Sequence, residues 1–337
     1  RARWLLKTGW KAQNLKFRFA PDKRLMPADQ YLARLMMDTM LMPLEKPQES
    51  AIVSIFTPCE LLQEAGIHPY NVEGFSCYLS ASKAERAFLQ QAENTGISET
   101  LCSYHKTFIG AAQKKVLPKP KCIVYTNLTC DANLLTFKKL AKMYEVPIFA
   151  IDVPMQQNED NVQYVADQLR KLKEFIEECT GKKITDEALT ERLRRSKRTL
   201  EKFAQYEKES ADKYVPADLV TPLYAGMTNN LLLGTKEEED YVDRLLKDVK
   251  NAPAKKGKKI YWMHTIPFWS DAVKNELCFQ EEAQIVGCEL SHVCEPDFDP
   301  EKPYEAMARR MVYHALNGSA IRRIEAGIRH AKETGAD

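Results

Sequence analysis

The stretch KCIVYTNLTCDANLLTFKK, residues 121–139, decides the fold class of this sequence of 337 residues. An apolar run at 122–127 is followed by polar residues and then by an amphipathic segment at 131–144. A short continuous apolar run is typical of a strand that is buried on both faces, as in a parallel sheet. The stretch therefore predicts a strand at 122–127 followed by a helix at 131–144, the order found in a βαβ unit.

The same pattern extends to both sides of this stretch. Apolar runs at 51–56 and 147–153 predict two further strands, and Val72 is expected to begin another. Helices are expected between the strands, at 60–65, 80–92 and 103–113. Because strands alternate with helices, we expect the strands of this unit to be parallel.

A second unit of the same kind is expected near the end of the sequence. Its strands are predicted at 260–264 and 283–286, and its helices at 271–279, 303–316 and 319–334. Long, charged amphipathic segments at 162–179 and 185–206 separate the two units and predict helices. The sequence thus predicts an α/β fold with two Rossmann-like parallel-sheet units plus a helical region.

These patterns divide the chain into four regions. Residues 1–48 form an N-terminal helical segment, and 49–180 form the first α/β domain. Residues 181–250 form a helical region, and 251–337 form the second α/β domain. In a βαβ fold a strand should follow the last helix, so we expect the second domain to continue beyond residue 337.

Composition excludes several classes of function. The sequence has 49 Lys plus Arg and 47 Asp plus Glu, a net charge of +2, which gives no support for nucleic acid or a membrane surface as a partner. No run of 18 apolar residues and no signal peptide are visible, so we expect a cytoplasmic protein. Nine cysteines in a reducing compartment favour a metal or cluster site over disulfides.

Two cysteines stand where predicted helices begin. Cys102 precedes the helix at 103–113, and Cys130 lies between the strand at 122–127 and its following helix. A helix N-terminus presents free N–H groups, lowers the pKa of a thiol and favours negative charge, so two such thiolates suit an anionic cluster or soft metal. The alternative is that both are small core residues. His105, one turn after Cys102, is either a hydrogen-bond donor to such a site or a half-exposed side chain.

A second candidate lies at the end of the strand at 51–56. Glu60 falls in the first turn of the next helix, and Cys59 precedes it. Ligands of parallel sheets bind at the carboxyl ends of strands, so Glu60 is a candidate acid or base. The alternative is that Glu60 only complements the helix dipole, which contributes about 0.3–1 kcal/mol. Cys59 is interpreted as a core residue.

The segment YWMHTIPFW, residues 261–269, ends the first strand of the second unit. Its aromatic side chains either line an apolar substrate pocket or pack between the two units. His264 and Thr265 are expected to point into the crevice between the units. The lysine-rich segment at 251–259 is interpreted as a solvated loop, because no aromatic residues interleave it.

Four strings, taken in order, resemble motifs of the 2-hydroxyacyl-CoA dehydratase family. The first is SIFTPCELL at 54–62, together with AGIHP at 65–69. The others are LCSY at 101–104, TNLTCDA at 126–132 and VPIFAIDVP at 146–154. The resemblance is to the D-component subunits of a superfamily that also holds benzoyl-CoA reductase subunits and double-cubane cluster proteins.

The resemblance implies a cofactor and a mechanism. Cys102 and Cys130 would be two of three cysteine ligands of a 4Fe–4S cluster, with the third ligand expected beyond residue 337. An ATP-dependent iron–sulfur activator protein would deliver one electron, and a ketyl radical of the 2-hydroxyacyl-CoA would lose water to give a 2-enoyl-CoA. Such a carbon–oxygen lyase works as a heterodimer with a homologous subunit. Glu60 would handle a proton at the substrate.

Two other functions remain open from the sequence. One is an ATP-dependent low-potential reductase of the same superfamily, of the double-cubane or benzoyl-CoA reductase type. The other is a non-catalytic subunit that relays electrons or acts as a scaffold for its partner.

Overall fold

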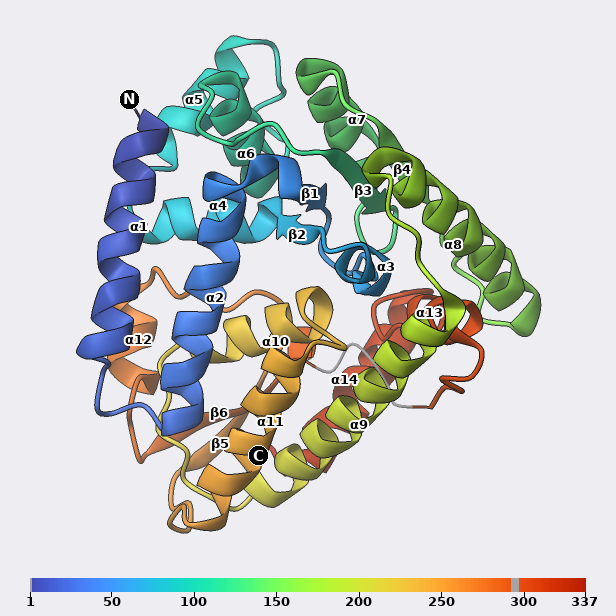
Figure 1. Cartoon of the computed structure of the whole chain (residues 1–337). Helices are drawn as coiled ribbons and strands as arrows, with labels where there is room; N and C mark the ends of the chain where they lie inside the picture. Colours follow the sequence, from blue (N-terminus) through green and yellow to red (C-terminus); the bar gives the residue numbers. More distant parts are fainter. Residues whose placement is uncertain (1, 292–296) are drawn as a thin grey trace.

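A four-stranded parallel sheet forms the centre of the first unit in the computed structural model, which describes residues 2–291 and 297–337 (Figure 1). The strand order is β2-β1-β3-β4, and every neighbouring pair is parallel. The strands are β1 (Ser50–Val53), β2 (His68–Asn71), β3 (Cys122–Thr126) and β4 (Ile148–Ile151). All residues of β1 and β3 are buried, which confirms the interpretation of their apolar runs.

The first strand ends three residues earlier than its apolar run suggests. The hydroxyl of Ser54 accepts a hydrogen bond from the Thr126 N–H at 3.1 Å and lies 3.0 Å from the Thr57 hydroxyl. The Ser54 hydroxyl therefore takes the place of a backbone carbonyl as the acceptor for Thr126, and the ladder between β1 and β3 ends here. The chain then turns through Phe56, whose φ of 67° lies in the left-handed region.

Five helices accompany this sheet, and two of the expectations for them were wrong. They are α3 (Glu60–Glu64), α4 (Val72–Ala81), α5 (Arg86–Asn94), α6 (Ser103–Gln113) and α7 (Asn133–Tyr144). Val72 begins a helix rather than a strand, because the Asn71 side chain caps it by accepting from the Gly74 N–H. The helix expected at 80–92 is two helices, which are separated at residues 82–85.

The two halves of this split helix meet α6 differently. α5 packs very closely against α6, because a Cβ at Gly110 would lie 2.0 Å from the carbonyl oxygen of Phe88. α4 is tied to the start of α6 by the Ser76 hydroxyl, which donates to the Tyr104 carbonyl at 2.9 Å. The break at residues 82–85 lets α4 and α5 approach α6 from different directions.

The N-terminal helical segment consists of two helices, α1 (Ala2–Phe19) and α2 (Pro27–Glu45). They run side by side along one edge of the molecule (Figure 1). Trp10 of α1 is buried and packs edge-on against Phe75 and Tyr78 of α4, with ring centroids 5.8 and 5.4 Å apart. This contact fixes α1 to the first unit.

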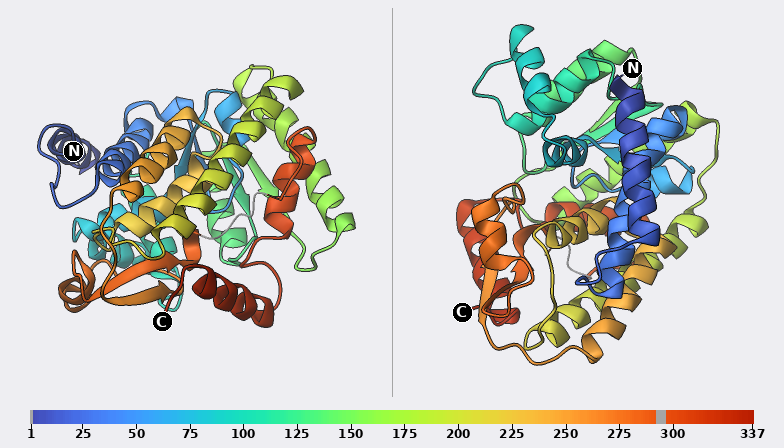
Figure 2. Two further views of the ribbon diagram at one scale, coloured as in Figure 1. Left: turned by 90° about the horizontal axis from the view of Figure 1, so that it is seen from below. Right: turned by 90° about the vertical axis from the view of Figure 1, so that its left-hand side faces the viewer.

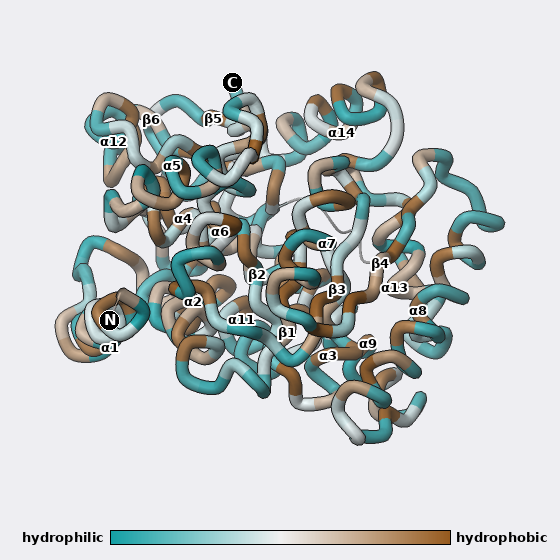
Figure 3. Tube along the Cα trace, turned by 90° about the horizontal axis from the view of Figure 1, so that it is seen from above, coloured by the Kyte–Doolittle hydropathy of each residue, from teal (hydrophilic) through white to brown (hydrophobic). Residues whose placement is uncertain are grey.

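Four helices form the region between the two sheets: α8 (Glu159–Thr180), α9 (Asp186–Ser210), α10 (Thr221–Leu231) and α11 (Lys236–Lys250). Side chains of Asn158, Thr185 and Thr235 cap α8, α9 and α11 by accepting N–H groups of their first turns. The trace of α8 alternates between hydrophilic and hydrophobic residues, as expected for an amphipathic surface helix (Figure 3).

The second sheet has two strands, β5 (Lys258–Trp262) and β6 (Ala283–Cys288), which pair in parallel. α12 (Asp271–Leu277) connects them, and α13 (Pro303–Val312) and α14 (Ala320–Glu333) follow. Parallel strands in both sheets confirm the predicted fold class. The Asp337 N–H donates to the Lys259 carbonyl at 2.9 Å, so residue 337 lies beside β5, far from the N-terminus in both views of Figure 2.

One hydrophobic core runs through most of the molecule. It includes Trp10 of α1, the strands of the first sheet and α8 to α11, and it reaches Val312 of α13. α13 packs on α8 and α9, which brings the second unit against the helical region. The division of the chain into four regions stays a prediction. Among the described residues, no helix combines the length and hydropathy needed to cross a membrane.

Candidate functional site

Cys102 and Cys130 both lie at the ends of helices, as the sequence indicates. Cys102 is the exposed residue that immediately precedes α6, and Cys130 is a half-buried residue in the turn between β3 and α7. Cys130 lies 3.6 Å from the Nε2 atom of His105, which is in α6 one turn after Cys102. The structure therefore brings the two predicted thiols to the same part of the molecule.

The helix start is expected to lower the pKa of the Cys130 thiol, but burial outweighs this effect. Backbone N–H groups of Ala132 and Asn133 donate to its sulfur and lower its pKa, as expected at a helix N-terminus. Burial acts in the opposite direction and is larger, so the pKa of Cys130 is raised above its usual value. The prediction of a lowered thiol pKa was wrong for Cys130, because the sequence did not reveal its burial.

His105 is buried and contacts Cys130 directly. Its Nε2 atom lies 3.6 Å from the Cys130 sulfur, and its Nδ1 atom lies 2.9 Å from the Thr136 hydroxyl. That hydroxyl donates its hydrogen to the Ala132 carbonyl at 2.8 Å, so it accepts from Nδ1–H. Burial lowers the pKa of His105 to about 4, which keeps the ring neutral. Nε2 is therefore an acceptor that is positioned to receive the thiol hydrogen of Cys130.

Backbone strain accumulates at the ends of three strands. Phe56 after β1, Thr129 after β3 and His264 after β5 all have positive φ, at 67°, 69° and 65°. For residues other than glycine this conformation costs on the order of 1–3 kcal/mol, and it is found preferentially at functional sites. Thr129 directly precedes Cys130, so the strained turn positions the thiol.

Glu60 lies in a very different environment from the two thiols. Its side chain is 1% exposed and is bound by Arg310 of α13, while the Ser196 hydroxyl of α9 lies 3.5 Å away. It borders a cavity of about 30 Å³ that Leu128 and His314 also line. Leu128 is two residues before Cys130, so Glu60 lies at the same carboxyl edge of the sheet as the thiols. Nothing in the structure tests its predicted role.

A larger cavity opens beside Cys102. It has a volume of about 840 Å³ and lies between α4, α5 and α6 of the first unit and α12 of the second. Ser103 and Tyr104, the two residues that follow Cys102, form part of its wall. Phe268 and Trp269 form another part, so the end of the aromatic segment at 261–269 lines a cavity. His264 and Thr265 are not among its lining residues.

Sequence reasoning missed Glu73 of α4. Its carboxylate accepts from the Asn71 side-chain amide at 2.8 Å and from the Ile55 N–H at 3.4 Å. Burial raises the pKa of Glu73 to about 7, and its charge contributes to the raised pKa of Cys130. The only available signal was a carboxylate in the first turn of a helix, and the erroneous strand at Val72 concealed it.

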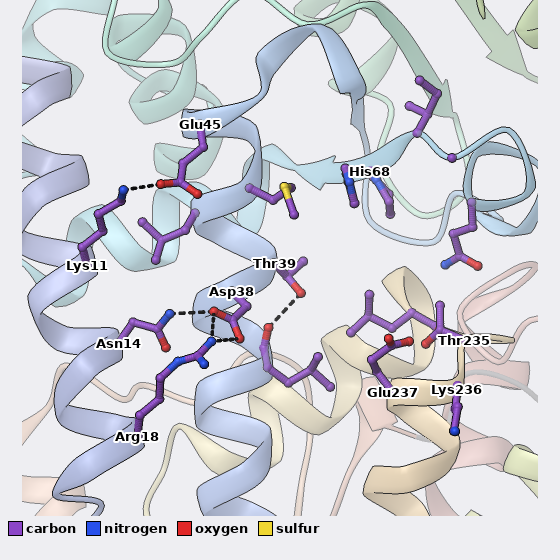
Figure 4. Close-up of a pocket in the computed structure, with 18 of the residues that line it drawn as sticks. Lys11, Asn14, Arg18, Asp38, Thr39, Glu45, His68, Thr235, Lys236 and Glu237 are labelled. Carbon is purple, nitrogen blue, oxygen red and sulfur yellow. Dashed lines mark hydrogen bonds and ion pairs between the residues drawn. The ribbon is translucent and has the colours of Figure 1, made fainter.

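Another large cavity, about 1010 Å³, lies at the opposite edge of the sheet, beside the start of β2 (Figure 4). Its charged side chains are mostly paired with one another: Lys11 with Glu45, and Arg18 with Asp38 at 2.9 Å. None of the predicted site residues lines it. Size alone therefore does not identify the functional site.

The two thiols form an incomplete donor set for a metal. Within residues 2–291 and 297–337, no group of three or more His, Cys, Asp or Glu side chains is arranged to hold a metal ion. Cys102 is exposed and Cys130 is partly accessible, so neither residue is closed off from a ligand. Cys102 and Cys130 would supply two ligands to a cluster at this position, and a further ligand would have to come from outside the described residues.

A family model described as "2-hydroxyglutaryl-CoA dehydratase, D-component" matches residues 54–337, which is most of the sequence. The chain belongs to this family. Glu60, Cys102, Cys130 and the cavity beside Cys102 all lie within the matched region, whereas α1 and α2 lie outside it. The resemblance stated from the sequence motifs is confirmed.

Two curated relatives of this D-component chain are dehydratase subunits. The chain is 23% identical over 216 residues to the (R)-phenyllactyl-CoA dehydratase alpha subunit of Clostridium sporogenes, covering 60% of this chain and 52% of the relative. It is 28% identical over 91 residues to subunit alpha of (R)-2-hydroxyglutaryl-CoA dehydratase from Acidaminococcus fermentans, covering 26% of this chain and 19% of the relative. The chain thus spans about half or less of the relatives it matches.

Proposed function

We propose that this chain is the iron–sulfur subunit of a 2-hydroxyacyl-CoA dehydratase, which eliminates water from a 2-hydroxyacyl-CoA to give a 2-enoyl-CoA. One observation carries the proposal: Cys130 contacts His105 of α6, the helix that Cys102 precedes, and the residues after Cys102 line a cavity of about 840 Å³. Membership of the D-component family supports the assignment of this site to dehydration. Both relatives are named as subunits, which supports a homologous partner subunit.

In this proposal Cys102 and Cys130 provide two of three protein ligands to a 4Fe–4S cluster, and the third lies outside residues 1–337. When bound, the cluster would supply a single low-potential electron, received from an ATP-dependent activator protein, for radical elimination of the 2-hydroxyl. The protein's own residues position this group. In the protein without a cluster, His105 accepts a hydrogen bond from the thiol of Cys130 and so holds this side chain in place, and α6 contributes a buried wall.

Iron analysis of the full-length protein tests the ligand roles. Anaerobically prepared protein should be brown, and Cys102→Ala or Cys130→Ala should lose most of its iron and sulfide, since too few thiolates remain. Cys278→Ala is the matched control, because Cys278 is also half-buried but lies at the end of α12. Unchanged iron content in both site variants, or an equal loss in the control, would refute the assignment.

We further propose that Glu60 handles a proton at the substrate. A proton-transfer role typically contributes about 10²–10⁴-fold in rate, so Glu60→Gln should lower turnover by that factor at unchanged cluster content. The assay requires the partner subunit, the activator, ATP and a strong reductant. Because Glu60 is bound by Arg310 in the interior, the variant's thermal unfolding must be measured alongside. A folded Glu60→Gln variant with near wild-type turnover would leave Glu60 a structural residue.

A further inference from the structure

The cavity beside Cys102 has a basic side that the thiol site does not explain. Three cations line it, Lys83, Arg86 and Lys274, against two carboxylates, Glu85 and Asp271. Lys274 already pairs with Asp271 at 3.1 Å on the surface of α12. The remaining cations, Lys83 and Arg86, lie just after α4 and at the start of α5.

Lys83 and Arg86 are available to a ligand. In the part of the chain that the structure describes, neither side chain takes part in an ion pair or a hydrogen bond, and both are exposed. Most other cations around the larger cavities are already paired, as for Lys11 and Arg18. Unpaired Arg and Lys side chains at a cavity wall are suited to phosphate, which Arg binds through two parallel hydrogen bonds.

An aromatic plane lies on the same cavity. Trp269 is 55% exposed, whereas its neighbour Phe268 is buried and holds it edge-on, with ring centroids 5.2 Å apart at 81°. An exposed indole on a buried support presents a flat, rigid face at low entropic cost. Such faces bind the π-systems of nucleic-acid bases by stacking.

We propose that this cavity binds the 3′-phospho-ADP part of a coenzyme A thioester, with the base on Trp269 and the phosphates on Lys83 and Arg86. The inference rests on the proposed function for the identity of the ligand. The geometry adds the direction: Ser103 and Tyr104 line the same cavity and follow Cys102, so the pantetheine arm leads the thioester towards the thiols. Residues from α4, α5 and α12 thereby place a substrate for chemistry at α6 and α7.

Binding of coenzyme A to the chain without a cluster tests this subsite independently of catalysis. We expect calorimetric titration with coenzyme A to show that Lys83→Ala and Arg86→Ala each weaken binding by about tenfold, as for the loss of a hydrogen bond to a charged group. Trp269→Leu should weaken binding by about fivefold or more and should remove the quenching of tryptophan fluorescence. Lys236→Ala, at the larger cavity, and Trp4→Leu, on the exposed face of α1, are the matched controls.

Two further ligands distinguish a coenzyme A site from a general nucleotide site. Adenosine 3′,5′-bisphosphate should compete with coenzyme A, whereas ADP, which lacks the 3′-phosphate, should bind more weakly. Equal affinity for ADP and coenzyme A would overturn the assignment in favour of a general nucleotide site. Wild-type affinity in both Arg86→Ala and Trp269→Leu, or a loss in Lys236→Ala, would overturn the location.

Failure of the coenzyme A subsite can be distinguished from failure of the proposed dehydratase function. Cys102→Ala should retain coenzyme A binding, because Cys102 is not among the residues that line the cavity. Iron content that does not depend on Cys102 or Cys130, combined with coenzyme A binding that depends on Arg86, would refute the cluster and support the subsite. Iron content that depends on Cys102 and Cys130, combined with coenzyme A binding that does not depend on Arg86, would refute the subsite and retain the cluster ligands.

Discussion

The turns after β1 and β3 occupy equivalent positions at the carboxyl edge of the same sheet, yet they present their functional candidates in opposite ways. The turn after β3 holds Cys130 half-buried and in contact with His105. The turn after β1 carries Glu60 into the interior, where Arg310 binds it. The difference arises from what packs above each turn: α13 and α9 cover Glu60, whereas the space beside Cys102 is a cavity.

This comparison teaches that strand-end position identifies candidates but does not decide their chemistry. An accessible thiol can accept a ligand at little cost to the fold. A buried carboxylate that is paired with a guanidinium is committed to a neighbour, and removing it breaks a buried ion pair. The following experiments separate these two situations.

The largest expected effect is on the free energy of unfolding when Glu60 is truncated. Glu60→Ala should cost up to about 3–5 kcal/mol, because it removes the buried carboxylate that pairs with the Arg310 guanidinium. Cys102→Ala should change stability by less than about 0.5 kcal/mol, because its side chain is exposed. Urea unfolding of both variants measures the difference.

A loss of less than about 1 kcal/mol in Glu60→Ala would restore the weaker role assigned from the sequence, in which Glu60 only complements a helix dipole. Such a result would also mean that solvent reaches Arg310 when the carboxylate is removed.

The second effect concerns Glu238, a fully buried neighbour of the Glu60–Arg310 pair. Burial and the charge of Glu60 raise the pKa of Glu238 well above its usual value, so the folded state holds its proton more tightly than the unfolded state. Its contribution to stability is complete below the unfolded pKa, about 4.3, and is lost as pH rises above it. Glu238→Gln cannot titrate and should avoid this loss.

We therefore expect wild type to lose up to about 1.4 kcal/mol per pH unit relative to Glu238→Gln above pH ~4.3, until the folded pKa is reached. Unfolding free energies of both proteins at pH ~4.5 and ~7 provide the measurement. Parallel curves would show that Glu238 titrates normally and that its site admits water.

The smallest effect concerns the strained turn before Cys130. Thr129→Gly removes the cost of a β-branched residue at positive φ but increases the entropy lost on folding, so stability should rise by no more than about 1 kcal/mol. The gain in freedom should loosen the position of Cys130 and lower iron retention during gel filtration. Thermal unfolding and iron analysis of one preparation measure both; a marked loss of stability would show that the strain inference is incorrect.

Much of the fold was predictable because local patterns carry it. The apolar runs of β1, β3 and β4, the helix at 103–113 and the amphipathic helices α8 and α9 all lie where the sequence patterns indicate. The region around Val72 failed for an equally local reason. There the Asn71 side chain caps a helix, whereas Val72 had indicated the start of a strand.

The candidate site was only partly predictable. Cys102, Cys130 and Glu60 were identified by their expected positions at helix starts; Cys102 and Glu60 lie there, whereas α7 begins three residues after Cys130. The raised pKa of Cys130 and the pairing of Glu60 with a residue 250 positions away were not predictable, because both depend on which elements pack nearby.

The sequence by itself determined the order of strands and helices, the parallel sheets and the family, because each depends on residues that are near one another in the chain. Tertiary structure alone decided that one strand-end turn is covered and the other open, and that Lys83, Arg86 and Trp269 share a cavity. Burial and charge pairing are properties of the space around a side chain. Elements that are distant in sequence fill that space, so no local pattern records them.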